Sequence, residues 1–82
     1  MVDKSSYYFT FISTGIVEED KHLDTVKAEL KKFLPGSAGL IDGITPMSEL
    51  IIEENLDFED IAELVKVFRN CGAGFRIDLS SQ

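Results

Sequence analysis

The sequence has a single cysteine, only two prolines and no long apolar run. One cysteine cannot form an internal disulfide, which excludes the small secreted proteins that disulfides hold together. No apolar segment approaches the roughly 20 residues needed to cross a bilayer, and the first residues lack the apolar region of a signal peptide. We therefore expect a cytoplasmic protein.

Positive charge is also scarce. Eight lysines and arginines stand against fifteen aspartates and glutamates, which gives a formal net charge of −7 on 82 residues. Nucleic-acid affinity comes largely from basic side chains that neutralise phosphates. The charge therefore argues against DNA, RNA and anionic membranes as partners, and a basic protein surface is the partner that it would attract.

Residues that carry chemistry are few and isolated. There is one histidine, His22, and no pair of cysteines at metal-ligand spacing, so we predict no metal site. Cys71 is expected just after the end of a helix, where the partial negative charge disfavours a thiolate, and it is interpreted as an inert structural thiol. Because no nucleophile, base and orienting group can be assembled, we predict a protein that is not an enzyme and uses no cofactor.

What the sequence does contain is an aromatic segment near its start, and we predict a strand over about residues 6–13. Aromatic and β-branched side chains suit a pleated sheet, in which successive side chains point to opposite faces. One face would carry Tyr7, Phe9 and Phe11, and the other Tyr8, Thr10 and Ile12. Neither face is plainly polar, which indicates a central strand, and Thr14-Gly15 is expected to end it.

Two segments have apolar residues at helical spacing, and we predict helices over about 20–33 and 58–70. Pro35-Gly36 should end the first helix. In the second, Asp57 is the expected N-cap with Asp60 at the third helical position, and Leu56 can pack against Ile61. Gly72 can adopt the left-handed conformation that ends a helix.

We predict three further strands, over about 38–41, 48–53 and 74–79. The last alternates strictly, with Phe75, Ile77 and Leu79 on one face. The first rests on the apolar pair Leu40-Ile41 before a turn. Residues 46–54 have two interpretations. Thr45-Pro46 can begin a helix, whereas Leu50-Ile51-Ile52 can be the centre of a strand. The β-branched pair Ile51-Ile52 favours the strand.

In chain order these elements give β-α-β-β-α-β in a single domain over residues 1–82. This is the order of a ferredoxin-like α+β sandwich, with a four-stranded antiparallel sheet in the strand order 4-1-3-2 and two helices on one face. If the helices cover Tyr7, Phe9 and Phe11, the opposite face of the sheet stays open.

Two features indicate partner binding: the open face is a mixed apolar patch, and the segment from Asp42 to Glu63 holds eight acidic side chains with no lysine or arginine. The predicted partner-binding residues are Tyr8, Thr10, Ile12, Ile51, Arg76, Glu53, Glu54, Asp57, Glu59, Asp60 and Glu63. The hypothesis is a small acidic protein-interaction module, either a homodimer or an accessory, inhibitor-like subunit, that binds itself or a basic protein.

Two alternatives remain at this level. The acidic surface can serve solubility alone. A regulatory domain of the same topology can also sense a small molecule, which would bind at a turn formed by Ser13-Thr14-Gly15 and at the start of the following helix.

Overall fold

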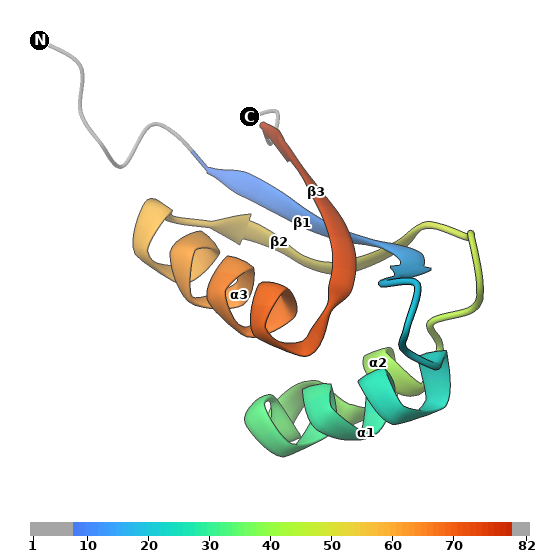
Figure 1. The fold of residues 1–82 in the computed structure, drawn as a ribbon. Coiled ribbons are helices and arrows are strands. Elements are labelled where there is room, and N and C mark those ends of the chain that lie inside the picture. Colours follow the sequence, from blue (N-terminus) through green and yellow to red (C-terminus); the bar gives the residue numbers. More distant parts are fainter. Residues whose placement is uncertain (1–7, 80–82) are drawn as a thin grey trace, which may run out of the picture.

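The computed structural model describes residues 8–79 (Figure 1). In chain order these residues form β1 (Phe9–Val17), α1 (Leu23–Phe33), the 3-10 helix η2 (Pro35–Ser37), α2 (Ala38–Asp42), β2 (Leu50–Leu56), α3 (Phe58–Cys71) and β3 (Ala73–Leu79). The fold is α+β, as predicted, and the helices lie on one side of the sheet. Residues 6 and 7 of the predicted first strand, including Tyr7, lie outside the described residues.

The three strands form one antiparallel sheet in the order β2-β1-β3. β1 therefore lies between two strands that run parallel to each other and are joined by α3. The extended conformation of the Leu50-Ile51-Ile52 segment is confirmed, because Leu50 pairs with Ser13 and Ile51 pairs with Ile12. The helical alternative for this segment is wrong.

The predicted fourth strand does not form, and with it the ferredoxin-like order 4-1-3-2 is wrong. Residues 38–42 form α2, which packs against α1 instead of extending the sheet. Ile41 and Ile44 are buried while Leu40 is exposed, a spacing that suits a helical turn better than a strand. Lys27 Nζ donates hydrogen bonds to the carbonyl oxygens of Asp42 and Ile44, at 2.8 and 3.1 Å, and these bonds hold the end of α2 against α1.

β1 is longer than predicted and runs through Thr14-Gly15, where we expected it to end. Gly15 has a φ of 75°, and the pairing of β1 with β3 shifts between Ser13 and Val17. The backbone N–H of Met47 donates to the Gly15 carbonyl oxygen at 3.2 Å. The glycine therefore marks an irregularity within the strand, at a point where the loop before β2 lies directly on its backbone.

The core lies between the sheet and the helices. Phe11 of β1 and Phe68 of α3 are fully buried and meet edge to face, with ring centroids 4.7 Å apart. Phe75 of β3 stacks on Phe11 at 5.2 Å. The remaining buried apolar residues of the core cluster are Val26, Leu30, Ile41, Ile44, Ile52, Leu56, Ile61, Leu64 and Cys71.

The ends of α3 match the prediction closely. Asp57 Oδ1 accepts a hydrogen bond from the backbone N–H of Asp60 at 2.9 Å, which satisfies one free donor of the first turn. Leu56 and Ile61 are both buried in the core. Gly72 has a φ of 79° and is the only residue between α3 and β3. Within residues 8–79, no helix has the length and apolar character needed to cross a membrane.

Candidate protein-binding face of the sheet

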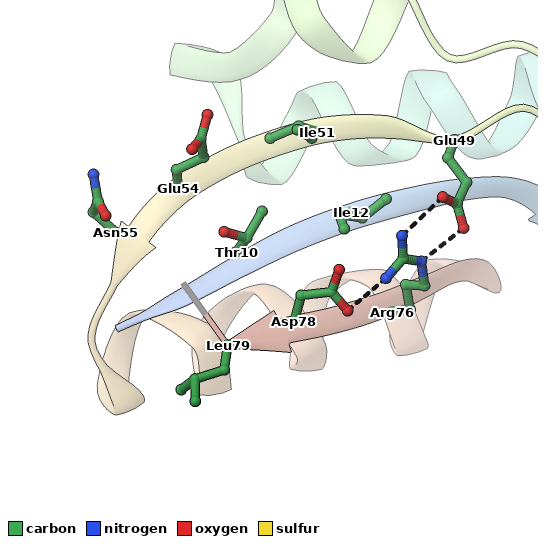
Figure 2. Close-up of a pocket in the computed structure, with 9 residues that line it drawn as sticks. All are labelled: Thr10, Ile12, Glu49, Ile51, Glu54, Asn55, Arg76, Asp78 and Leu79. Carbon is green, nitrogen blue, oxygen red and sulfur yellow. Dashed lines mark hydrogen bonds and ion pairs between the residues drawn. The ribbon is translucent and has the colours of Figure 1, made fainter. Parts of the chain in front are cut away.

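The face of the sheet that turns away from the helices holds a shallow hollow, which we call the open face (Figure 2). The residues that line it are Thr10, Ile12, Glu49, Ile51, Glu54, Asn55, Arg76, Asp78 and Leu79. They come from all three strands and from the residue before β2. Five of the predicted partner-binding residues are among them, namely Thr10, Ile12, Ile51, Glu54 and Arg76.

Arg76 organises the charge on this face. Its guanidinium donates two hydrogen bonds to the carboxylate of Glu49, from Nε to Oε2 at 2.7 Å and from Nη2 to Oε1 at 2.9 Å, and Nη1 donates to Asp78 Oδ1. The hydrogen bond from Arg76 lowers the pKa of Glu49, and the same interaction raises the pKa of Arg76. Two parallel bonds to one carboxylate fix the orientation of both side chains.

The bridge between Arg76 and Glu49 changes the expected character of the face. It runs from β3 to the residue before β2 and so spans β1 beside Ile12 (Figure 2). Ile12 is only 5% exposed, although no helix packs on this side of the sheet, whereas Ile51 is 48% exposed. The face therefore carries more charge than we expected, and its exposed large apolar side chains are Ile51 on β2 and Leu79 at the end of β3.

Of the predicted acidic residues, only Glu54 lines the hollow. Glu59 and Glu63 are exposed on the side of α3 opposite Ile61 and Leu64, which pack toward the sheet. They therefore point away from the open face. The remaining predicted residues also lie outside the hollow: Glu53 is exposed on β2, Asp57 and Asp60 form the N-terminal cap of α3, and Tyr8 is partly buried just before β1.

Four residues of the hollow were not among the predicted site residues, namely Glu49, Asn55, Asp78 and Leu79. A regular strand that places Ile51 on the open face would place Glu53 there as well. The pairing of β2 with β1 is irregular at two points, and Asn55 has a φ of 57°. These irregularities bring Glu54 and Asn55 to the open face. The signal in the sequence was the asparagine, which tolerates positive φ better than most residues.

The turn proposed for metabolite binding is absent, because Ser13, Thr14 and Gly15 lie within β1. Ser13 is buried. A Cβ atom at Gly15 would lie only 2.1 Å from the carbonyl oxygen of Thr45, which shows how closely the preceding loop of β2 covers this backbone. The sequence hypothesis of a small-molecule site at this position therefore loses the geometry on which it depended.

His22 and Cys71, which appeared isolated in the sequence, line one hollow at the start of α1 and the end of α3. No hydrogen bond joins them. Burial raises the pKa of the Cys71 thiol, and the nearby charge of Glu29 raises it further. Across residues 8–79 no three potential ligands gather closely enough to hold a metal ion. The raised pKa disfavours a thiolate at Cys71.

Comparisons with protein-family models, with curated proteins and with solved structures give no significant match.

Proposed function

We propose that this chain is a protein-interaction module, not an enzyme, and that it binds a basic segment of a protein partner on the open face of its sheet. The observation that carries the proposal is the charge of the hollow, where three carboxylates stand against one guanidinium. Arg76 is already bound by Glu49 and Asp78. Glu54 makes no ion pair within residues 8–79 and is the group that would attract a lysine or arginine of the partner.

The neighbouring residues supply the other parts of a binding surface. Ile51 of β2 is exposed in the hollow and offers apolar area on the same strand as Glu54. The side chains of Arg76 and Glu49 are held by two hydrogen bonds, so little side-chain freedom remains to be lost when a partner docks. The surface is thus partly ordered in advance.

A basic partner is favoured over a second copy on this face. Two copies placed face to face would bring Glu49, Glu54 and Asp78 of one copy toward the same carboxylates of the other. Like charges juxtaposed across an interface are destabilising. The homodimer expected from the sequence is therefore less well supported on the open face than a complex with a positively charged protein segment.

The proposal is tested with two single charge reversals. Glu54→Lys alters the open face, and Glu59→Lys alters the solvent side of α3 while changing the net charge by the same amount. Proteins captured from a lysate by the wild-type chain are purified, and their affinity for the two variants is measured by isothermal titration calorimetry. We expect Glu54→Lys to weaken binding of the captured protein at least about tenfold and Glu59→Lys to leave it nearly unchanged.

Equal weakening by both variants would show that net charge alone drives the interaction. Binding that is insensitive to Glu54→Lys and to Ile51→Ala would place the partner elsewhere. Either result, or the absence of any captured protein, would contradict the proposal. Circular dichroism of each variant checks that the fold is unchanged.

A further inference from the structure

The outer edge of β3 borders the open face and is a second candidate binding surface. β3 is an edge strand of the sheet. Among residues 8–79, no backbone hydrogen bond outside the sheet involves residues 74–79. Edge strands present unpaired N–H and C=O groups to which another strand can add.

The two edges of the sheet differ in how they are protected. β2 is irregular at two points, carries the adjacent charges Glu53 and Glu54, and contains Asn55 in a left-handed conformation. Such features keep other strands from pairing. β3 lacks them from Phe75 to Leu79, because its pairing with β1 is regular there and the segment contains neither proline nor lysine; the shift in its pairing lies before Phe75. The edge that is open to pairing is therefore that of β3.

We propose that β3 pairs antiparallel with β3 of a second copy of this chain, about a two-fold axis that passes through Ile77. In this register Ile77 of one copy lies opposite Ile77 of the other, Arg76 lies opposite Asp78, and Phe75 lies opposite Leu79. A two-fold interface has to be complementary to itself, and the sequence Arg76-Ile77-Asp78 meets this requirement. An axis through Arg76 or Asp78 would instead place like charges opposite each other.

The apolar side of β3 supports the same register. Ile77 and Leu79 pair with Phe11 and Phe9 of β1 on the helix side of the sheet, yet they are 38% and 63% exposed. Leu79, at the end of β3, also lines the hollow of the open face. In the proposed pair, Ile77 covers its counterpart and Leu79 meets Phe75, whose ring already stacks on Phe11 at 5.2 Å. The aromatic core would then continue across the two-fold axis.

Antiparallel pairing about an axis perpendicular to the sheet keeps the helices of both copies on one side. The result is one continuous sheet with two open faces on the opposite side, so edge pairing leaves the proposed partner-binding face accessible. The inference does not depend on the proposed function, because it concerns the backbone edge of β3 and a different partner, although Arg76 and Asp78 also line the open face.

Charge swaps test the register directly. Arg76→Asp places two aspartates opposite each other at both ends of the contact, and Asp78→Arg places two arginines there. Sedimentation of the full chain over a concentration series should show a monomer–dimer equilibrium for the wild type and monomers for each variant. An equimolar mixture of the two variants should form dimers again, because every opposed pair then carries opposite charges.

A matched pair of lysine substitutions separates the edge from the open face. Ile77→Lys puts two lysines on the axis and should raise the dissociation constant of the dimer at least about tenfold. Ile51→Lys introduces the same residue on the open face and should leave the dimer intact. Ile77→Cys adds no charge, and on oxidation it should form a covalent dimer through the two facing thiols, whereas Ile51→Cys should not.

A wild-type chain that sediments as a monomer up to roughly 1 mM would overturn the inference. So would a mixture of Arg76→Asp and Asp78→Arg that stays monomeric although circular dichroism shows both variants folded. If either charge variant fails to fold, the oxidation of Ile77→Cys decides alone. An Ile77→Cys variant that forms no more covalent dimer than Ile51→Cys would show that no two-fold axis passes through Ile77.

Discussion

Replacing Gly15 by alanine should destabilise this protein strongly, because two separate requirements for glycine coincide at this position. The φ of 75° is one that residues with a Cβ atom rarely adopt. The added Cβ would also lie 2.1 Å from the carbonyl oxygen of Thr45 and 2.8 Å from the backbone nitrogen of Met47. Both neighbours are backbone atoms, so no side-chain rotation can relieve the contact.

The magnitude follows from these two effects. A left-handed conformation costs a residue such as alanine about 1–2 kcal/mol. Moving the loop away also breaks the hydrogen bond from Met47 to Gly15, which contributes about 0.5–1.5 kcal/mol. We therefore expect a loss of about 1.5–3.5 kcal/mol. A domain of this size is stable by roughly 4–12 kcal/mol, so the loss is a large fraction of the total.

The control is the same substitution in α2. A Cβ atom at Gly39 meets no atom within 4 Å. Alanine reduces the freedom of the unfolded chain and favours the helix, so Gly39→Ala should raise the free energy of unfolding by up to about 0.5–1 kcal/mol. Urea unfolding followed by circular dichroism measures both variants. The two substitutions are chemically identical and should change stability in opposite directions.

A free energy of unfolding for Gly15→Ala within about 1 kcal/mol of the wild-type value would contradict the close approach of residues 45–48 to β1. The position of the loop that leads into β2 would then also be wrong. Thermal unfolding gives an independent measure, since each kcal/mol should move Tm by roughly 4–8 °C in a domain of this size.

Two further predictions concern the ends of α3 and the ion pairs. Asp57→Ala should lower the free energy of unfolding by about 0.5–2 kcal/mol, because the N–H of Asp60 loses its acceptor, while Asp57→Asn should retain most of the stability in the same urea assay. The pKa of Asp42 is lowered by its hydrogen bond from Lys31, and that of Glu49 by its hydrogen bond from Arg76. Both pKa values are below those of the unfolded chain, so the stabilisation is complete above the ordinary carboxyl range and is lost as the pH falls through the lowered values. The free energy of unfolding should therefore decline as the pH is lowered below the ordinary glutamate pKa of 4.5. Glu49→Gln should make this decline shallower. A Glu49→Gln variant with the same pH profile as the wild type would contradict the role of the Arg76 bridge.

The elements that could be predicted from the sequence are those in which the capping and turn residues indicate the same structure as the pattern of apolar residues. The capping aspartate and the terminal glycine of α3 occupy their predicted positions, and Ile61, Leu64 and Phe68 of its apolar stripe are buried as expected. Phe58, which we expected on the buried face, is exposed. The segment Leu50-Ile51-Ile52 was ambiguous between helix and strand, but its β-branched pair favoured the correct answer.

α2 was missed because short apolar runs carry too little periodicity to separate a strand from a helical turn. Leu40-Ile41 before Asp42-Gly43 has the composition of a strand that leads into a turn. The residues that pack are instead Ala38, Ile41 and Ile44, which are three apart and follow the helical spacing. The available signal was this spacing, continued from the partly buried Leu34 at the end of α1.

The candidate site was predicted in part, because alternation along a strand places residues on a face only while the strand is regular. Thr10, Ile51 and Arg76 lie on the open face as expected. Because β2 is irregular, Glu54 lies on the open face, where a regular strand would place Glu53. The contact between Arg76 and Glu49 joins residues 27 positions apart, and no local pattern in the sequence indicates it.

The central position of β1 has a consequence for the order of events during synthesis on the ribosome. Both neighbours of β1 come from the second half of the chain, at Leu50–Leu56 and Ala73–Leu79. A nascent chain elongates at about 5–20 residues per second. The first of these strands therefore waits for seconds without a hydrogen-bonding neighbour, and the contact of Phe11 with Phe68 and Phe75 forms only when the last helix and strand have been made.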